Sequence, residues 1–333
     1  MRSIHIAPAT TELLGLLDTP SLLVRGDRIV FANPAALTLL GAHIEGQDVR
    51  LALRDPDALA ILRTSEGGHV RVSGLSVSGS IWGLTSHALA DGTRFVTLED
   101  LSASASVARA HADFVANASH ELRTPLATII GYAETLSDTK AGCDPATRDR
   151  FLAIIKNEAA RMQALVEDLM SLSRIEAVKH EAPRTPVDLI ALAREAAGEV
   201  AHRASVEVVS SFSSAMVAGD RGQLAQVLRN LIDNAIKYGT PDIKVAIIIT
   251  PTDSGWLSLC VKDNGEGIAP EHLPRLTERF YRADAGRSHQ VGGTGLGLSI
   301  VKHIVERHRG RFDITSRLGE GTVASMVLPA LSK

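Results

Sequence analysis

Two stretches of apolar residues at helical spacing, separated by one break, constrain the fold of this chain more than any other feature. The apolar residues of the first stretch are Phe114, Leu122, Leu126, Ile129, Ile130, Ala133 and Leu136. Those of the second are Phe151, Ile154, Ile155, Met162, Leu165, Val166, Leu169, Leu172 and Ile175. Gly142 and Pro145 lie between the two stretches and interrupt a helix. We therefore predict a helical hairpin whose second helix covers residues 147–177.

Each apolar stripe of this hairpin is too wide to be buried against a single partner helix. A homodimeric four-helix bundle formed through residues 102–179 would cover both stripes. A monomeric hairpin packed on a neighbouring domain is the alternative, although it leaves more apolar surface in water.

The first helix of the hairpin carries a histidine, His120, in a chemically suggestive setting. Thr124 lies one helical turn later on the same face, and Glu121 lies beside that face. Pro125 lacks a backbone donor, so we expect it to bend the helix. A histidine next to a carboxylate suggests a nucleophile that a phosphoryl group could reach. The chain has 12 histidines, so an ordinary surface role is the alternative for His120 taken alone.

Composition indicates a soluble protein of two or three domains. The chain has 333 residues, of which 45% are hydrophobic and 22% charged, and its net charge of −3 argues against binding to nucleic acid or to an anionic membrane. Cys143 and Cys260 are too few for a zinc site or a disulfide framework. The N-terminus lacks the apolar core of a signal peptide, and glycines interrupt the longest uncharged stretch, residues 72–90. We therefore expect a cytoplasmic protein without a membrane span.

The N-terminal part reads as a short leader, residues 1–20, followed by a small α/β domain over residues 21–101. Strand patterns cover residues 21–24, 28–32, 69–78, 80–89 and 93–99. Between the second and third strand patterns, Asn33 is placed to cap a helix that has Pro34 at its first position and ends at Gly41. This domain has no cysteine, so it cannot sense light through a flavin–thiol adduct.

The C-terminal part, residues 187–333, follows a linker over residues 180–186 that contains Pro183 and Pro186. Helical patterns cover residues 187–203, 223–237 and 298–309, and residues 271–282 read as irregular and helical. Strand patterns cover residues 206–212, 215–219, 243–250, 256–262, 311–316 and 321–328. Because helices and strands do not alternate strictly, we predict an α/β sandwich with one mixed sheet.

Two motifs in this part indicate a bound nucleotide. Asn230, Asn234 and Lys237 share one helical face, where amide oxygens suit Mg²⁺ and a lysine suits phosphate. A solvated helix face is the alternative for these three residues. Asp263 begins the sequence Asp-Asn-Gly-Glu-Gly directly after an apolar strand. Its carboxylate could accept a hydrogen bond from an exocyclic amine, and the glycines let backbone approach a flat ligand.

Two further motifs follow along the chain. Residues 279–282 form a basic and aromatic cluster, Arg-Phe-Tyr-Arg. Residues 292–298, Gly-Gly-Thr-Gly-Leu-Gly-Leu, open a predicted helix, and glycine-rich backbone at a helix N-terminus can hold phosphate. This loop is neither a Rossmann fingerprint, because no strand precedes it, nor a Walker loop, because no Gly-Lys-Ser or Gly-Lys-Thr follows.

Taken in order, these motifs resemble those of two-component sensor histidine kinases over residues 114–329. The matching segments are the H box (119–126), the N box (230–238), the G1 box (263–268), the F box around Phe280 and the G2 box (293–298). The helices and boxes are similar to those of phosphate-regulon-type sensor kinases, without their usual membrane segment. Residues 21–101 resemble a PAS sensor domain, on the segments 31–33, 36–41 and 98–102. His43, His69 and His87 could in principle bind haem there, but an ordinary surface or strand role is the stronger interpretation.

The resemblance implies a multidomain α+β protein. It comprises a PAS-like sensor, a dimeric phosphoacceptor hairpin and a Bergerat-type ATP-binding α/β sandwich. His120 would be the phosphoacceptor and Glu121 the general base, and Thr124 would position water for a phosphatase reaction. The phosphoryl group would pass to the receiver domain of a response regulator.

The resemblance also implies which residues bind ATP, with residues 283–297 as a lid over the site and Asn234 as the residue that holds Mg²⁺. The expected ATP-binding residues are Asn230, Asn234, Lys237, Tyr238, Asp263, Gly265, Gly267, Arg282, Gly293, Thr294, Gly295, Leu296 and Gly297. An ATPase of the chaperone, mismatch-repair or topoisomerase type is one alternative, against which the His120 hairpin argues. A scaffold without chemistry is another, against which the complete set of ATP-site residues argues.

Overall fold

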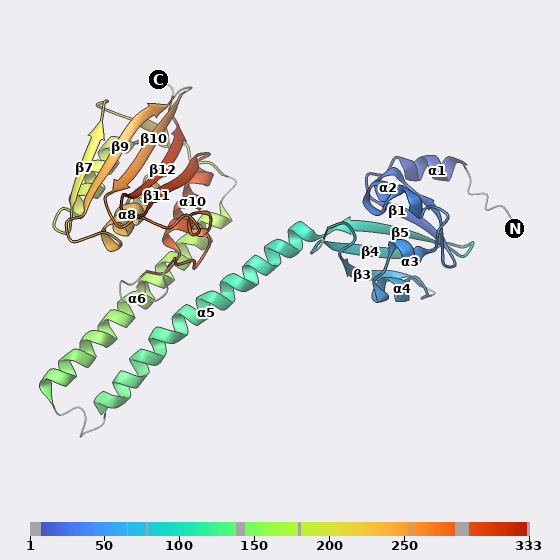
Figure 1. Cartoon of the computed structure of the whole chain (residues 1–333), viewed down its shortest axis with the longest axis horizontal. Coiled ribbons are helices and arrows are strands. Elements are labelled where there is room, and N and C mark those ends of the chain that lie inside the picture. Colours follow the sequence, from blue (N-terminus) through green and yellow to red (C-terminus); the bar gives the residue numbers. More distant parts are fainter. Residues whose placement is uncertain are drawn as a thin grey trace. The chain divides into compact units, whose positions relative to one another are not determined.

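The computed structural model describes residues 8–64, 66–77, 79–137, 144–178, 181–252, 255–283 and 293–331. The chain divides into two compact units, residues 1–115 and 116–333, and it has the expected multidomain α+β fold (Figure 1). None of the helices formed by these described residues combines the length and the apolar character needed to cross a membrane.

The first unit is built on an antiparallel sheet with the strand order β2-β1-β5-β4-β3. Its strands are β1 (Ser21–Arg25), β2 (Arg28–Ala32), β3 (Gly68–Ser73), β4 (Ile81–Ala88) and β5 (Thr93–Asp100). Its helices are α1 (Pro8–Gly15), α2 (Pro34–Leu40), the 3-10 helix η1 (Ala42–Ile44), α3 (Val49–Ala52) and α4 (Pro56–Ile61). Aliphatic side chains fill the core, and those of Leu22, Ile29, Leu84 and Leu98 are fully buried.

Asn33 is the polar centre of this first unit. It caps α2 as predicted, because its Oδ1 accepts hydrogen bonds from the backbone N–H groups of Ala36 and Ser21, both at 2.9 Å. Its amide group donates to the carbonyl oxygens of Leu17 and Thr19, also at 2.9 Å. Asn33 is fully buried, and these bonds offset the cost of removing its amide from water. One side chain thus joins the start of β1, the start of α2 and the segment that follows α1.

The strand β3 is shorter than the predicted strand over residues 69–78. It ends at Ser73 because Gly74 adopts a left-handed φ of 73°, which leaves the extended conformation. The N–H of Gly74 donates to the carbonyl of Ser80 at 2.9 Å and closes a turn into β4. The alternating sequence beyond Ser73 therefore belongs to a connection.

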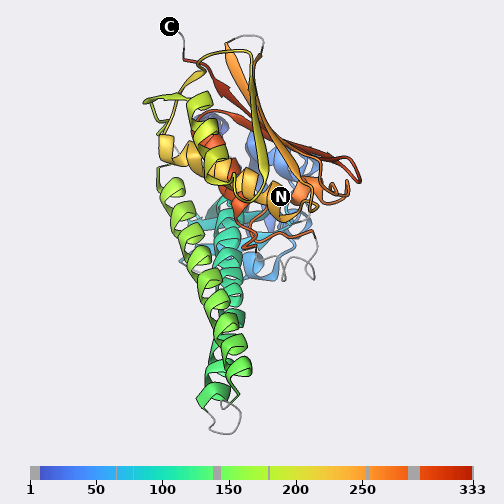
Figure 2. The same cartoon turned by 90° about the vertical axis from the view of Figure 1, so that its left-hand side faces the viewer.

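The predicted hairpin consists of α5 (Ser102–Ser137) and α6 (Pro145–Ala177), which lie side by side in both views (Figures 1 and 2). Asp144 caps α6 by accepting from the N–H of Thr147 at 3.0 Å. The rings of Tyr132 on α5 and Phe151 on α6 pack with their centroids 4.8 Å apart. Helix α5 continues on both sides of Pro125, which is buried. The loop between the helices, residues 138–143, lies outside the described residues.

The second unit also contains a mixed five-stranded sheet with the order β11-β12-β10-β9-β7, in which β7 and β9 are parallel. Its strands are β7 (Ser205–Ser210), β9 (Lys244–Thr252), β10 (Trp256–Asp263), β11 (Arg311–Arg317) and β12 (Gly321–Pro329), and a small ladder joins β6 (Pro186–Asp188) to β8 (Met216–Ala218). Its helices are α7 (Leu189–Glu199), α8 (Arg221–Lys237), α10 (Gly297–Arg307) and the 3-10 helix η2 (Leu273–Arg275). The helices α7, α8 and α10 cover one face of the sheet, which confirms the predicted α/β sandwich (Figure 2).

The helix predicted over residues 187–203 is shorter at both ends than expected. Val187 belongs to β6 and pairs with Val217, and the helix α7 begins only at Leu189. Asp188 fixes this start, because its carboxylate accepts from the N–H of Ile190 at 3.0 Å and of Ala215 at 3.1 Å. A capping residue has extended backbone, so the helix cannot extend upstream of it.

A buried histidine, His308, ties the C-terminal end of α10 to the N-terminal end of α8. Its Nε2 accepts from the N–H of Asp220 at 2.9 Å, and its Nδ1 donates to the carbonyl of Ile304 at 2.7 Å. Since a backbone N–H can only donate, the ring must be neutral with its proton on Nδ1. Burial, the largest influence, lowers the pKa of His308 below its ordinary value of 6.5.

This lowered pKa predicts that the second unit loses stability in acid. The folded state binds fewer protons than the unfolded state, so the free energy of unfolding should fall as pH drops through about 6.5 toward the folded pKa. Urea unfolding at pH 7.5 and 5.5 measures this, with Trp82→Phe as background so that Trp256 alone reports on β10. His308→Gln should reduce the pH dependence, whereas His202→Gln, an exposed histidine, should leave it unchanged. Equal pH dependence in both variants would contradict the prediction.

Candidate active site

The turn after β10 is held in a fixed shape by the carboxylate of Asp263. Its Oδ1 accepts from the N–H of Gly265 at 2.8 Å and from the N–H of Thr322 at 3.1 Å. Asn264 fixes the other side, because its Oδ1 accepts from the N–H of Lys244 at 2.7 Å. Both backbone bonds to Asp263 go to the same oxygen, which leaves Oδ2 for a ligand.

Steric contacts explain why this turn has glycine at the two predicted positions. Gly267 has a left-handed φ of 74°, and a Cβ added there would lie 2.0 Å from the carbonyl oxygen of Arg317. Gly265 is buried, and its Cβ would lie 3.0 Å from Oδ1 of Asp263. The turn therefore brings bare backbone against β11 and against the Asp263 carboxylate.

The asparagine face of α8 meets the start of α10. The amide of Asn230 donates to the carbonyl of Gly297 at 3.3 Å. Tyr238 follows α8, and a Cβ on Gly293 would lie 3.1 Å from its hydroxyl. The structure thus brings Asn230 and Tyr238 to the glycine-rich loop. Asn234, one turn after Asn230, is half-buried, and within the described part of the chain no hydrogen bond engages its amide.

The F box and the G2 box are bonded to each other. The N–H of Phe280 donates to the carbonyl of Gly295 at 2.9 Å, and both residues have left-handed backbone, with φ of 62° and 71°. A Cβ on Gly295 would lie 2.9 Å from the Cα of Phe280, so glycine is required there. Leu296 is buried beneath this contact. Of the predicted lid, residues 284–292 lie outside the described residues.

Near the F box, the guanidinium of Arg282 is the clearest polar group that lacks hydrogen-bond partners among the described residues. Its Nε and Nη2 are buried and have no hydrogen-bond partner within the described residues. A buried guanidinium without a partner is costly, and a phosphate would satisfy it with two parallel hydrogen bonds. Together with the bare glycine backbone, this group fits a bound polyphosphate.

His120 is exposed on α5 and lines a cavity of about 460 Å³. One wall of the cavity comes from α5, and the other comes from the segment that contains the F box. The lining residues are Asn117, His120, Glu121, Arg275, Glu278, Arg279, Phe280 and Tyr281. The predicted nucleophile therefore faces a segment that is itself hydrogen-bonded to the glycine-rich loop.

The two residues predicted to assist His120 have distinct contacts. The carboxylate of Glu121 lies 3.5 Å from the guanidinium of Arg161 on α6, which orients it beside the cavity. The hydroxyl of Thr124 donates to the carbonyl of His120 at 3.4 Å and is exposed. Both side chains thus remain near the histidine and accessible.

Sequence reasoning missed the polar residues of α6 that contact the rest of the second unit. Thr294 donates to Asp168 at 2.6 Å, and Arg279 forms an ion pair with Glu176. The guanidinium of Arg275 stacks over the ring of Tyr281, 4.3 Å from its centroid. The sequence does show a row of polar residues beside the apolar stripe of α6. A helix face exposed to water has the same pattern, so the row alone did not identify these contacts.

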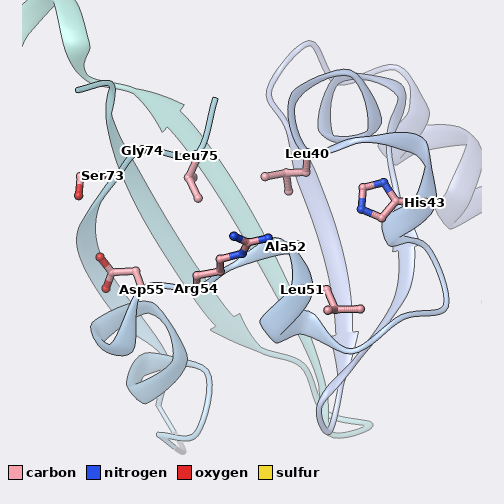
Figure 3. A pocket seen from close by; sticks show the side chains of 9 residues that line it. All are labelled: Leu40, His43, Leu51, Ala52, Arg54, Asp55, Ser73, Gly74 and Leu75. Carbon is pink, nitrogen blue, oxygen red and sulfur yellow. The ribbon is translucent and has the colours of Figure 1, made fainter. Parts of the chain in front are cut away.

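The first unit carries a pocket of about 300 Å³ between α2, α3, the start of α4 and the end of β3 (Figure 3). His43 and Arg54 line it, together with leucine side chains. His69 lies elsewhere, on β3, where its Nδ1 is 3.0 Å from the Thr85 hydroxyl on β4. The contact of His69 is that of an ordinary strand residue.

Comparison with known proteins accounts for the three parts in their order along the chain. Residues 15–72 match the family model of the PAS domain, and residues 110–178 match the His Kinase A (phospho-acceptor) domain. Residues 219–332 match the histidine kinase-, DNA gyrase B- and HSP90-like ATPase.

The chain belongs to the sensor histidine kinase family.

Relatives of known name agree with this family. The chain is 42% identical over 217 residues to the phosphate regulon sensor protein PhoR of Pseudomonas aeruginosa, a match that covers 63% of this chain and 48% of PhoR. This histidine kinase chain thus spans about half the length of that curated relative. The solved structure of the Acinetobacter baumannii histidine kinase AdeS is 27% identical in sequence to this chain, and the two superpose with a TM-score of 0.51. The match covers 64% of this chain and 98% of the AdeS chain.

A third comparison extends over nearly the whole chain. The match is to the histidine kinase ThkA, solved in complex with the response regulator protein TrrA, and it has a TM-score of 0.55. It covers 96% of this chain and 98% of the matched chain. At 20% identity this likeness shows the fold alone. The phospho-acceptor match distinguishes this sensor kinase from the gyrase and chaperone ATPases that share the ATPase family model.

Proposed function

We propose that this chain is an ATP-dependent protein-histidine kinase that phosphorylates its own His120 and passes the phosphoryl group to an aspartate of a response regulator. The observation that carries the proposal is the cavity in which His120 faces the F-box segment. That segment is bonded through Phe280 to the glycine-rich loop, so a phosphate donor held by the loop would lie next to the segment that lines the His120 cavity.

ATP is the donor that fits the site. Oδ2 of Asp263 can accept from the exocyclic amine of adenine, since Oδ1 is occupied by backbone donors. The unpartnered guanidinium of Arg282 and the side chain of Lys237 supply positive charge for the phosphates. Gly293, Thr294, Gly295 and Gly297 supply backbone that a phosphate can approach at the N-terminus of α10.

The residues also fit a magnesium ion bound together with the nucleotide. Mg²⁺ commonly takes one or two protein ligands and completes its shell with phosphate oxygens and water. Asn234 would hold the ion, because its amide is free of hydrogen bonds within the described residues and Asn230 next to it is bonded to Gly297. When bound, Mg²⁺ neutralises charge on the phosphates.

Phosphoryl transfer depends mainly on positioning and charge neutralisation. A ring nitrogen of His120 attacks the γ-phosphorus of ATP, the N–P bond forms, and the bond to the bridging oxygen breaks to release ADP. Glu121 accepts the proton from the other ring nitrogen, and Arg161 keeps its carboxylate in place. Thr124 would orient water for the opposing phosphatase reaction, in which water attacks the aspartyl phosphate of the response regulator and releases inorganic phosphate.

The proposal includes a homodimer formed through the hairpin. Apolar side chains on both helices are close to half exposed in a single chain, which a second copy would cover. These residues are Leu126, Ile130, Leu152, Val166 and Met170.

The proposal also includes a cytoplasmic location, because the kinase needs both ATP and a response regulator.

Labelling with ATP that carries radioactive γ-phosphate tests the proposal. We expect the label on the protein to be lost in acid and retained in base, as phosphohistidine requires, and to move rapidly to one of a set of purified response regulators. Label that survives acid treatment would assign the phosphate to another residue. Hydrolysis of ATP without labelling of the protein would favour a simple ATPase.

Asn234→Ala should reduce autophosphorylation on the order of 100-fold, because the magnesium ion would lose its protein ligand. The direct measurement is nucleotide affinity with and without Mg²⁺: the wild type should bind more tightly with the ion, and the variant should not. Asp233→Ala is the matched control, since the carboxylate of Asp233 pairs with Arg203 at 2.8 Å. A variant Asn234→Ala that keeps the full response to Mg²⁺ contradicts the metal role.

A further inference from the structure

The last turns of α6 form an interface with the ATP-binding domain. Helix α10 packs against α6, and Leu172 and Ile175 are buried. Beside these apolar residues, the hydroxyl of Ser171 donates to Oε1 of Gln226 at 2.9 Å, and Glu176 forms an ion pair with Arg279. The phosphoacceptor hairpin therefore holds the ATP-binding domain through side chains on one face of α6.

One contact in this interface reaches the glycine-rich loop itself. Oγ1 of Thr294 donates to Oδ2 of Asp168 at 2.6 Å, and the same hydroxyl accepts from the N–H of Leu296 at 3.3 Å. A hydroxyl has a single hydrogen to donate. While Thr294 is bonded to Asp168, it cannot donate to a phosphate oxygen.

A second predicted phosphate-binding group also acts on Asp168. Burial is the largest influence and raises the pKa of Asp168, whereas the hydrogen bond from Thr294 and the positive charge of Lys237 favour the carboxylate. Glu167 alongside adds a like charge. Thr294 and Lys237 are both proposed to bind the phosphates of ATP. In this structure Thr294 is hydrogen-bonded to Asp168 on the hairpin, and the positive charge of Lys237 acts on the same carboxylate.

We propose that Asp168 competes with the phosphates of ATP for the hydroxyl of Thr294 and for the positive charge of Lys237, so that nucleotide binding breaks the contact between Asp168 and Thr294. The proposal rests on the proposed function of the site. A carboxylate and a polyphosphate that both lie at hydrogen-bonding distance from the Thr294 hydroxyl repel each other, so Asp168 and the phosphates cannot both bind this hydroxyl at full strength. The Asp168 contact is an autoinhibitory clasp.

The clasp couples the hairpin to the affinity for ATP. Coupling between two binding events is reciprocal, so a movement of α6 that withdraws Asp168 from Thr294 must raise the affinity for ATP by the same factor by which ATP weakens the clasp. A signal that shifts the hairpin helices can therefore set how readily the kinase loads its substrate.

Nucleotide titrations on the full chain test the clasp. Asp168→Asn removes the charge but keeps an oxygen that can accept from Thr294, and Asp168→Ala removes both. We expect a non-hydrolysable ATP analogue to bind about 5- to 10-fold more tightly to Asp168→Ala than to the wild type, in the range of ordinary coupling energies. Asp168→Asn should show a smaller gain. Adenosine, which has no phosphates, should bind all three proteins equally.

Glu167→Gln is the matched control, because it removes the neighbouring charge without touching Thr294. Its affinity for the analogue should stay near that of the wild type, and circular dichroism should confirm that all variants fold. Unchanged affinity for the analogue in both Asp168 variants would overturn the clasp, as would an equal gain for adenosine. A wild type that binds neither ligand would instead refute the proposed function.

Discussion

Replacing His120 with alanine is expected to abolish labelling of the chain by γ-labelled ATP while leaving ATP binding intact. His120 lies on α5, whereas the groups proposed to hold the nucleotide lie on β10, α8 and the loop before α10. The substitution removes the only nucleophile that the proposed mechanism uses and none of the groups that are proposed to contact ATP. Residual transfer should therefore fall below detection, and the affinity for ATP should stay within about twofold, since exposed substitutions seldom exceed 0.5 kcal/mol.

The matched control is His111→Ala, because His111 is an exposed histidine on the same helix. It should be labelled like the wild type. Retained acid-labile phosphate on the His120 variant would assign the phosphoacceptor to a different residue. Loss of ATP binding in that variant would instead mean that the hairpin contributes to the nucleotide site.

Replacing Asp263 with asparagine should weaken ATP binding on the order of 100-fold without unfolding the domain. The amide oxygen of asparagine can replace Oδ1 and keep the hydrogen bonds from Gly265 and Thr322. The amide NH₂ then takes the position of Oδ2 and faces the exocyclic amine of adenine, which is also a donor. A lost charged hydrogen bond and a buried mismatch together cost about 3 kcal/mol.

Calorimetric titration with ATP and with inosine triphosphate measures this directly, since inosine carries an oxygen where adenine carries the amine. The wild type should prefer ATP, and the asparagine variant should lose that preference. Asp313→Asn, an exposed site on β11 with the same change in charge, should behave like the wild type. A preserved preference for ATP in the Asp263 variant would remove this residue from adenine recognition.

The secondary structure that positions the site could be read from local patterns. Apolar periodicity predicts α5, α6 and α8, and Asn33 and Pro34 predict the start of α2, because each pattern depends only on neighbouring residues. Local patterns gave the wrong start for α7, since the pairing of Val187 with Val217 in β6 depends on residues 30 positions away. The early end of β3 at Gly74 was also missed, because alternation continues in the sequence beyond it.

The candidate site, too, has features that the sequence predicts and features that it does not. The ordered boxes place Asp263, Asn230 and Gly295 near one another, and the structure gives each a packing reason. The roles of these residues in binding and catalysis stay predictions. The contact between Asp168 and Thr294 could not be foreseen, because it joins residues 126 positions apart that carry no motif in common.

The hydrogen bond between Phe280 and Gly295 also determines where this domain can accept extra sequence. Phe280 and Gly295 are bonded to each other, so the two ends of the segment between them stay together whatever the length of that segment. The entropy of closing such a loop grows logarithmically, and doubling its length costs only about 0.6 kcal/mol. A fluorescent reporter inserted between Ala283 and Gly293, away from Arg282 and Thr294, should thus leave the sandwich intact, whereas a side chain added at Gly295 would break the hydrogen-bonded contact itself.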